Sequence, residues 1–373
     1  MHILITADTV GGVWTYAREL VTGLVGRGVR VTLVSFGDIP SLSQTNWMHL
    51  LRIGNDAPLD YRPTAFKLEW MRDCAADMEA SADYLRRLIS ETKPDLLHFN
   101  QFYYGSLDCD LPRLLVAHSD VVSWWNAVHG QEPPPSSWLS WYRDSVSCGL
   151  EKATAVIAPS RWMMDQVERH YFKPRHGSVI YNGRSPGLFN PNMTKEDRIV
   201  TVGRLWDRGK NAGLLLETPM PAPVAIVGAR HEPGTHSSLF LVEDAGANVD
   251  LQSQQDESQL VQTLGRASIY AAVSQYEPFG LAPLEAALSR CAIVASDIPA
   301  LRELWDGAAV FFRGNDAQDL RQTMEMLVRD PALRNQCAGL VYNRARERFH
   351  AARMVDQYLS LYRALSPATV AAA

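Results

Sequence analysis

Apolar segments of strand length alternate with segments of helical periodicity along most of this chain of 373 residues. The first series opens with HILIT at 2–6, continues through an amphipathic stretch that ends at Gly28, and resumes with VRVTLVSF at 29–36. Near-continuous apolar strands separated by helices are typical of a parallel sheet covered on both faces. The alternation starts again after 178–192, which is rich in Asn, Gly and Pro. The pattern therefore predicts two successive Rossmann-like α/β domains joined by a linker.

The length of the chain indicates roughly two or three domains with an ample core. We expect the final helical stretch to return and pack on the first domain. The predicted boundaries are 1–175 for the N-terminal domain, 176–193 for the linker, 194–350 for the second domain and 351–373 for the C-terminal helix and tail.

Composition excludes several classes of function. A net charge of -5 and a pI near 6.1 argue against a nucleic-acid partner, because there is no basic field to attract phosphates. No apolar run reaches the length of a membrane span, no leader-like segment precedes HILIT, and the membrane signal is weak. The five cysteines are scattered without a C-x-x-C pair, as in a cytosolic protein with free thiols. We expect a cytoplasmic protein, and its oligomeric state stays open.

The segment QYEPFGLAPLEAALSR contains two carboxylates, Glu277 and Glu285, spaced eight residues apart. It follows the apolar run IYAAVS, and its Ala-rich second half predicts a helix that begins near Gly280. Backbone N–H groups at such a helix N-terminus attract phosphate or sugar oxygens. Both carboxylates can face one cleft, although the spacing alone is equally compatible with two surface carboxylates.

This segment resembles the E-x7-E signature of retaining glycosyltransferases with the GT-B fold, of the family 4 or group 1 type. The family's pattern E-x-F-G-L…L-E-A reads EPFGLAPLEA here. Three other segments resemble the family in the same order, namely VIYNGRSPGLFNP, VTVGRLWDRGKN and SDIPALRELWDGAAVFF. The resemblance covers nearly the whole chain and is most specific over 178–315. It implies two Rossmann-like domains with parallel sheets facing an inter-domain cleft, the first binding the acceptor and the second the nucleotide sugar.

The resemblance implies a donor site in the second domain. Arg204 and Lys210 correspond to cations that stabilise the departing diphosphate. The family usually separates this pair by five positions, so Arg208 is the alternative to Lys210. Glu277 is expected to hold a hydroxyl of the transferred sugar, and Glu285 to accept hydrogen bonds from the ribose. Further donor contacts are expected from the main-chain amides of Phe279, Gly280, Leu281 and Ala282, and from a nucleobase wall at 248–255.

The first domain is implied to supply the rest of the reaction centre. His118 ends the strand LLVAH, where family members often carry a His, and it completes an expected catalytic set with Glu277, Arg204 and Lys210. The pair Gly11–Gly12 is expected to bring amides against the distal phosphate or the transferred sugar, with a plain tight turn as the alternative. Eight of the ten tryptophans precede residue 163. Because flat rings stack on sugars, acceptor contacts are expected from Trp14, Trp124, Trp125 and His129.

Two local structures can also be predicted. The segment 119–142 combines aromatic residues with three consecutive prolines, which favours a long functional loop over regular structure. The segment ATAVIAPS, 153–160, predicts a strand that leads into a helix with Ser160 as its N-cap. The turn before the apolar strand near residue 292 departs from the family pattern, because Arg290 stands where a Gly is usual. We expect this departure to alter the turn and to leave the chemistry unchanged.

The expected function is transfer of a sugar, with retention, from a nucleotide-diphosphate sugar to a hydroxyl of a saccharide, glycan intermediate or small molecule. A UDP-sugar is the expected donor on frequency, and neither a metal nor any other cofactor is expected. The D-C-D sequence at 108–110 is interpreted as coincidental. A sugar-nucleotide epimerase or hydrolase and a non-catalytic sugar-nucleotide sensor are the alternatives. A Rossmann oxidoreductase is disfavoured, since DTVGGVW lacks the G-x-G-x-x-G spacing.

Overall fold

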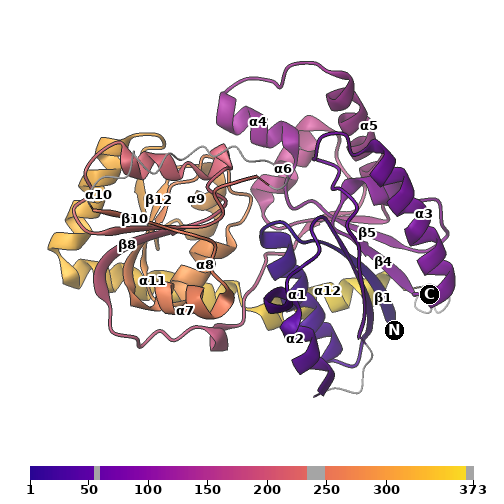
Figure 1. Ribbon diagram of the computed structural model, residues 1–373, viewed down its shortest axis with the longest axis horizontal. Helices are drawn as coiled ribbons and strands as arrows, with labels where there is room; N and C mark the ends of the chain where they lie inside the picture. Colours follow the sequence, from indigo (N-terminus) through magenta and orange to yellow (C-terminus); the bar gives the residue numbers. More distant parts are fainter. Residues whose placement is uncertain (54–58, 233–247, 367–373) are drawn as a thin grey trace. The chain divides into compact units, whose positions relative to one another are not determined.

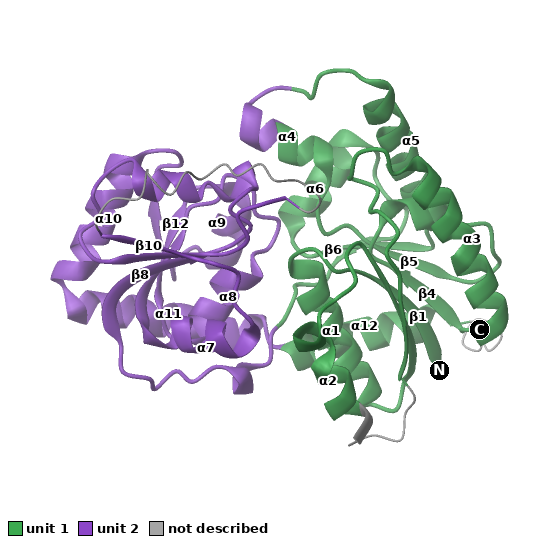
Figure 2. Cartoon of the chain, viewed as in Figure 1, with its two compact units in different colours: residues 1–125, 132–183, 351–373 green, residues 126–131, 184–350 purple. Residues whose placement is uncertain are grey.

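The structure is a computed structural model that describes residues 1–53, 59–232 and 248–366 (Figure 1). The chain forms two compact units, which are coloured separately in Figure 2. Unit 1 comprises residues 1–125, 132–183 and those from 351 onward, and unit 2 comprises residues 126–131 and 184–350. Unit 1 is therefore built from segments that are separated in the sequence.

Unit 1 contains a parallel sheet with the strand order β3-β2-β1-β4-β5-β6-β7. The central strand β1 is buried along its whole length, as its continuous apolar pattern predicts. The register of β1 and β2 runs from His2 opposite Arg30 to Asp8 opposite Phe36. The strands are β1 (His2–Asp8), β2 (Arg30–Phe36), β3 (Leu59–Pro63), β4 (Leu96–Phe99), β5 (Arg113–Val116), β6 (Ala155–Ala158) and β7 (Gly177–Val179).

The helices of unit 1 follow the strands in alternation. They are α1 (Gly12–Val25), α2 (Leu42–Ile53), α3 (Ala75–Thr92), the 3-10 helix η1 (Phe102–Ser106), α5 (Ser137–Lys152), α6 (Arg161–His170) and α12 (Ala351–Leu365). A further helix, α4 (Val121–His129), begins in unit 1, and its residues from 126 onward belong to unit 2. The predicted N-cap of α6 is confirmed, because the Ser160 hydroxyl accepts from the Met163 N–H at 3.1 Å.

The helices cover both faces of the unit 1 sheet. One face packs against α3, α5 and α6 in a single apolar core that includes Leu97. Side chains alternate along a strand, so the neighbouring His98 points to the opposite face. There it contacts Tyr16 of α1 and Tyr362 of α12. The yellow helix α12 lies beside α1 in Figure 1, and Val355 of α12 closely approaches Gly23 of α1.

The segment 119–142 is more regular than its composition indicates. It contains α4 and the start of α5, and within it only 119–120 and 130–136 lack regular structure. Gly130, at φ 67°, follows the end of α4, and the three prolines lie in the connection, where they interrupt no helix. Ser136 then caps α5 by accepting from the Leu139 N–H. The prediction of a long irregular loop was wrong, because the aromatic residues on either side of the prolines fit helices with a buried face.

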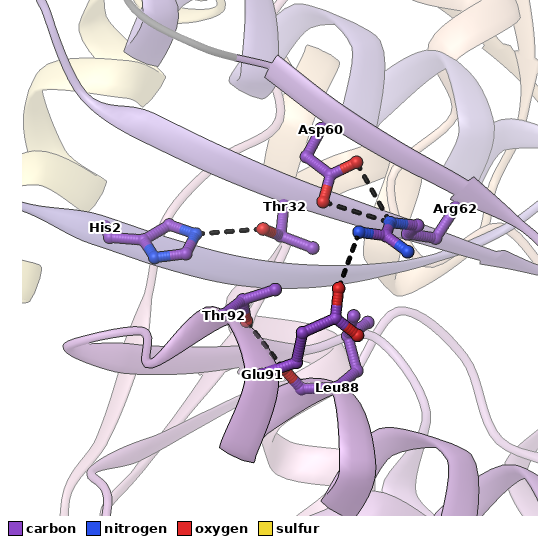
Figure 3. A network of polar contacts seen from close by, with 7 residues as sticks. All are labelled: His2, Thr32, Asp60, Arg62, Leu88, Glu91 and Thr92. Carbon is purple, nitrogen blue, oxygen red and sulfur yellow. Dashed lines mark hydrogen bonds and ion pairs between the residues drawn. The ribbon is translucent and has the colours of Figure 1, made fainter.

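Polar contacts fasten β3, the edge strand of the unit 1 sheet, to its surroundings (Figure 3). Arg62 of β3 lies between two carboxylates: its Nε is 3.0 Å from both oxygens of Asp60, and its Nη2 is 3.0 Å from Glu91 of α3. Farther in, the His2 ring lies 2.9 Å from the Thr32 hydroxyl of β2. The ion pairs occupy an edge where an exposed strand would otherwise present unshielded backbone.

Unit 2 contains a second parallel sheet, with the order β10-β9-β8-β11-β12-β13. Its strands are β8 (Glu196–Val202), β9 (Val224–Val227), β10 (Val249–Gln252), β11 (Ala267–Ala272), β12 (Ala292–Ser296) and β13 (Val310–Phe312). Its helices are η2 (Pro186–Leu188), η3 (Arg208–Lys210), η4 (Ala212–Leu216), α7 (Glu257–Arg266), α8 (Leu281–Leu288), α9 (Pro299–Trp305), α10 (Ala317–Arg329) and α11 (Pro331–Arg348). Two α/β units with parallel sheets agree with the fold predicted from the sequence.

The turn after α8 keeps a left-handed residue although it lacks glycine. Arg290 has φ 63°, its N–H donates to Ala287 O, and the Cys291 N–H donates to Ala286 O. These are the two hydrogen bonds of a Schellman C-cap, in which the left-handed position is usually glycine. The expectation that Arg290 alters the turn was therefore wrong. The Arg290 guanidinium lies 5.9 Å from the centroid of the Tyr342 ring, a contact that favours this conformation.

Each sheet has one point at which the order of its strands reverses. In unit 1 the chain moves outward through β2 and β3, and then returns to the other side of β1 with β4. In unit 2 the corresponding pair is β8 and β11. Ligands of open parallel sheets bind beyond the carboxyl ends of the strands at such points. No helix in the described part of the chain is both long enough and apolar enough to cross a membrane.

Candidate functional site

The loop after β8 carries the predicted diphosphate cations. Asp207 organises it, because its carboxylate accepts from the Gly209 N–H at 2.9 Å and lies 2.7 Å from Nη2 of Arg204. The Gly209 carbonyl accepts in turn from the N–H groups of Gln275 and Tyr276, at 2.9 and 3.2 Å. The cation-bearing loop after β8 is thereby joined to the loop after β11, across the point where the strand order reverses.

This arrangement brings Lys210 and Glu277 together. The Lys210 ammonium lies 2.5 Å from Oε2 of Glu277, and the Ser274 hydroxyl lies 3.3 Å from the same oxygen. Both side chains line a cavity of about 10 Å³ that also contacts Gly203 and Tyr270. Arg208, the sequence-based alternative to Lys210, is exposed and is not among the lining residues. The geometry therefore favours Lys210 as the partner of Glu277.

Gly280 positions the N-terminus of α8 beside Glu277. It has φ 86°, and a Cβ at this position would lie 3.0 Å from Cγ of Glu277, so any side chain here would be strained and crowded. No side chain caps the helix, and its first turn holds no acidic residue. The amides at Leu281 and Ala282 begin the helix and have no intrahelical acceptor. The buried ring of Phe279 packs edge-on against Phe349, with ring centroids 5.3 Å apart.

Glu285 lies one turn into α8 and is 6% exposed. Its carboxylate forms an ion pair with Arg184, which the sequence analysis did not single out. Burial and the nearby charges of Glu277 and Glu285 raise the pKa of the Tyr270 phenol. Glu277 lies in the loop between β11 and α8 and Glu285 lies in α8 itself, and the shared cleft that the sequence analysis allows for them stays a prediction.

The predicted nucleobase wall, 248–255, coincides with β10 and the turn that follows it. β10 is an edge strand of the unit 2 sheet, next to β9. The Leu251 carbonyl accepts from the Arg230 guanidinium at 2.8 Å. β10, β9 and β8 run parallel in this order, so their carboxyl ends lie on the same side of the sheet. The turn after β10 and the Arg204 loop after β8 therefore both follow carboxyl ends of strands.

In unit 1, the pair Gly11–Gly12 forms the N-terminus of α1 at the carboxyl end of β1. Gly11 is the N-cap residue, with φ 90°, and both glycines are exposed. No side chain caps this helix, and its first turn holds no acidic residue. The pair is therefore more than a tight turn in geometry, because it places helix N-terminal amides at the point where the unit 1 sheet reverses.

His118 follows β5 and is held by Asn100, which follows β4. The Asn100 amide nitrogen lies 2.5 Å from the Thr6 carbonyl, so its oxygen faces the His118 ring at 2.7 Å from Nε2. This network assigns the proton to Nε2 and leaves Nδ1 as the acceptor nitrogen. Burial and the neighbouring His98 lower the pKa of His118 to about 3. His118 is therefore a neutral imidazole with a defined tautomer.

The four predicted acceptor contacts differ in their surroundings. Trp14 is 6% exposed, donates its indole N–H to the Gln44 carbonyl and packs against Trp47 and Tyr61, which favours a structural role. Trp124 and Trp125 are half-buried neighbours on α4, with ring centroids 6.3 Å apart in an edge-to-face arrangement. His129 lies in the last turn of the same helix.

Two residues that contact the site were missed in the sequence. Asn100 carries a signal that could have found it, since it ends the strand DLLHFN at the carboxyl edge where ligands bind. Arg184 lies within VIYNGRSPG, but nothing in its local pattern indicates a contact with Glu285, 101 positions away. No group of three or more His, Cys, Asp or Glu side chains that could hold a metal occurs in 1–53, 59–232 or 248–366.

The buried histidine of β4 predicts a loss of stability in acid. Burial lowers the pKa of His98 to about 3, below the value of 6.5 for an unfolded chain. The contribution of neutral His98 to the unfolding free energy is complete above pH 6.5 and is lost as pH falls toward 3. In this range His98 takes up a proton in the unfolded chain but stays neutral in the folded protein. Between pH 6.5 and 4.5 the wild type should lose roughly 2 kcal/mol more unfolding free energy than His98→Gln.

Urea unfolding at several pH values measures this difference. His49→Gln, which changes an exposed histidine of the same unit, is the matched control and should follow the wild type. Parallel pH profiles for wild type and His98→Gln would contradict the assignment of a neutral buried His98.

The chain matches two protein families in succession. Residues 10–187 match Glycosyltransferase Family 4, and residues 190–344 match Glycosyl transferases group 1. Among curated proteins, an alpha-maltose-1-phosphate synthase from Mycolicibacterium smegmatis is 27% identical over 322 residues, which are 73% of this chain and 79% of that protein. An enzyme of the same name from Mycobacterium tuberculosis is 30% identical over 289 residues, 68% of this chain and 73% of that protein.

Solved structures share the whole fold. Sucrose-phosphate synthase from Thermosynechococcus elongatus has a TM-score of 0.78 at 18% identity, with 98% of this chain and 99% of that chain covered. HepE from Anabaena, solved in complex with UDP-glucose, has a TM-score of 0.71 at 16% identity, with 98% and 100% covered. The predicted GT-B fold is confirmed.

Proposed function

The chain belongs to the family 4, group 1 glycosyltransferases, and from this membership we propose that it moves a sugar, with retention of configuration, from a nucleotide-diphosphate sugar to an acceptor hydroxyl. The proposed donor is a UDP-sugar. The single observation that carries the proposal is the contact between Lys210 and Glu277 where the unit 2 sheet reverses, beside the N-terminus of α8. A cation and helix amides suit a diphosphate, and a carboxylate suits a sugar hydroxyl.

In the proposed reaction the bond between the sugar and the diphosphate breaks, and negative charge accumulates on the leaving group. Lys210 and Arg204 stabilise that charge, and the amides at the start of α8 add to it. Glu277 accepts a hydrogen bond from a hydroxyl of the transferred sugar. Since Lys210 already pairs with Glu277 in the structure, the two side chains hold each other in position before the donor arrives.

His118 of unit 1 is proposed to position a substrate hydroxyl and to carry no charge. His118 is neutral, and Asn100 fixes its proton on Nε2, so Nδ1 can accept a hydrogen bond from a substrate hydroxyl. We propose that the leaving phosphate itself accepts the acceptor's proton on the same face of the sugar, which accounts for retention without a protein nucleophile. The proposal includes no metal, because Lys210 and Arg204 supply the cations.

The proposed acceptor is a saccharide or a small molecule with a free hydroxyl. The names of the mycobacterial relatives and of sucrose-phosphate synthase denote phosphorylated disaccharide products. Sugar phosphates therefore belong in the acceptor panel together with oligosaccharides and aromatic glucosides. The half-buried rings of Trp124 and Trp125 are the proposed stacking surfaces for such an acceptor.

Two linked assays test the function. In the first, UDP-, ADP- and GDP-glucose are added during thermal melting, and saturating donor should raise the melting temperature by about 5 °C. In the second, purified protein is incubated with the stabilising donor and the acceptor panel in EDTA, and a new glycoside with retained anomeric configuration is detected by mass spectrometry and NMR.

The outcomes separate the candidate functions. Free nucleotide with altered or hydrolysed sugar, formed without any acceptor, would establish the epimerase or hydrolase alternative. Stabilisation without turnover on any acceptor would favour a sugar-nucleotide sensor. Activity that disappears in EDTA and returns with a divalent cation would contradict the metal-independent reaction.

A further inference from the structure

A buried arginine contacts Glu285, the carboxylate that the family resemblance implies as the acceptor of hydrogen bonds from the ribose. Arg184 is 2% exposed, and its Nε lies 2.8 Å from Oε1 of Glu285. Its Nη2 donates to Oε1 of Glu257, the first residue of α7, at 2.8 Å. One guanidinium therefore contacts carboxylates from two helices, α7 and α8.

The rest of the residue fixes the guanidinium in place. The Arg184 backbone N–H donates to the Phe349 carbonyl at 3.0 Å, and its guanidinium carbon lies 5.4 Å from the centroid of the Phe189 ring. Phe349 is itself packed between the rings of Phe279 and Trp305, with centroids 5.3 and 5.4 Å away. A long side chain held at its backbone and along its length has little freedom to move away from Glu285.

The burial of the Arg184–Glu285 ion pair bears on how Glu285 can bind a ribose. Glu285 is buried, and the Arg184 guanidinium at 2.8 Å supplies the cation that a buried carboxylate needs as a partner. A neutral carboxyl donates one hydrogen bond, whereas an ionised carboxylate only accepts. The ribose diol offers two hydroxyl donors, so it is bound best by an ionised group whose orientation is already set.

We propose that Arg184 is the positioning residue of the nucleotide site, which holds the side chain of Glu285 so that its carboxylate accepts from the ribose hydroxyls. This inference rests on the proposed function, since it takes Glu285 as the ribose acceptor. Arg184 contacts Glu285 and acts through it. Its effect is therefore specific to the ribose part of the ligand and leaves recognition of the diphosphate to Lys210 and Arg204.

The test compares two nucleotides that differ only in the ribose. Dissociation constants for UDP and for 2′,3′-dideoxy-UDP are measured by calorimetry, and ADP with 2′,3′-dideoxy-ADP is used if the wild type prefers adenine. Wild type should bind the ribose form about 10-fold or more tightly than the dideoxy form, as expected for hydrogen bonds to a charged group. Arg184→Lys keeps the positive charge but loses the planar guanidinium that contacts two carboxylates at once. We expect the preference of this variant for the ribose form over the dideoxy form to fall below about 3-fold.

Three variants complete the experiment. Glu285→Gln should show the same reduced preference as Arg184→Lys, and the double variant should show no further loss, because both changes act on one interaction. Glu257→Gln is the matched control: it removes the ion pair between Arg184 and Glu257 and should keep the wild-type preference. Arg184→Gln is measured as well, in case Arg184→Lys does not fold, and thermal melting verifies each variant.

The failures of the two proposals are distinguishable. Equal weakening of both nucleotides in Arg184→Lys, with the ribose preference unchanged, would overturn the positioning role and leave the proposed function standing. Wild type that binds nucleotides without a ribose preference would overturn the role of Glu285 and this inference with it. Wild type that binds none of UDP, ADP and GDP would overturn the proposed function itself.

Discussion

Lys210→Ala should reduce the kcat/KM of sugar transfer by about 10³-fold, because it removes a charged donor that is aimed at the departing diphosphate. Glu277→Ala should cause a loss of similar size, since each side chain holds the other at 2.5 Å. The double variant should be little worse than either single variant, because groups that act as a unit are not additive. Initial rates with the donor identified by thermal melting measure all three.

Arg208→Ala is the matched control for this prediction. Arg208 lies in the same 3-10 turn as Lys210, η3, but is exposed. We expect its rate to stay within about 2-fold of wild type, as for an exposed charge with weak interactions. The reverse result, a silent Lys210→Ala and an inactive Arg208→Ala, would transfer the role of second cation to Arg208. Far-ultraviolet circular dichroism would establish that the inactive variants are folded.

Gly149→Ala should destabilise unit 1 by about 3 kcal/mol or more, an overpacking effect at the upper end of the usual range. Gly149 of α5 is pressed against η1: a Cβ there would lie 1.9 Å from the Phe102 carbonyl oxygen, far inside contact distance. The obstacle is backbone, so no side chain can rotate away. Gly105 of η1 faces the same contact, with the Gly149 carbonyl oxygen 2.4 Å from its would-be Cβ.

The control for this prediction is the same substitution in another helix. A Cβ added to Gly339 of α11 would have no neighbouring atom within 4 Å, so Gly339→Ala meets open space. It should be neutral or stabilising by about 0.5–1 kcal/mol, since Ala favours helix more than Gly does. Thermal melting of both variants makes the comparison. A Gly149→Ala variant that melts with the wild type would show that α5 and η1 separate at little cost.

Much of the fold could be predicted because it depends on local pattern. Continuous apolar runs predicted the buried parallel strands, and a Ser after the run ATAVIAP predicted the cap of α6. The error at 119–142 shows the limit of that reasoning. The three prolines indicated a loop, but composition does not tell how close to the prolines the flanking helices end and begin. That boundary depends on the cap at Ser136, and the next residue, Ser137, could have capped a helix equally well by its type.

In the candidate site, too, contacts within one segment could be predicted, whereas contacts between distant segments could not. Glu277, Gly280 and Glu285 belong to one continuous segment, so their relative placement follows from a loop and a helix. The partners of these residues come from elsewhere in the chain. Lys210 reaches Glu277 because β8 and β11 are neighbours in the sheet, and Arg184 reaches Glu285 through packing that no local pattern encodes. The roles of these residues remain predictions until the variants are measured.

The return of α12 to unit 1 has a consequence for synthesis of the chain. Tyr358 and Tyr362 of α12 enclose His98, so the core of the first unit is completed by residues translated after all of unit 2. At ordinary elongation rates, roughly 10 to 40 seconds separate the end of β7 from the emergence of α12. During this interval the nascent first unit lacks the helix that packs on Tyr16 and His98, and a core surface left uncovered in this way is the kind that chaperones bind. A chain that terminates early at residue 350 would leave His98 without its Tyr358 and Tyr362 contacts permanently.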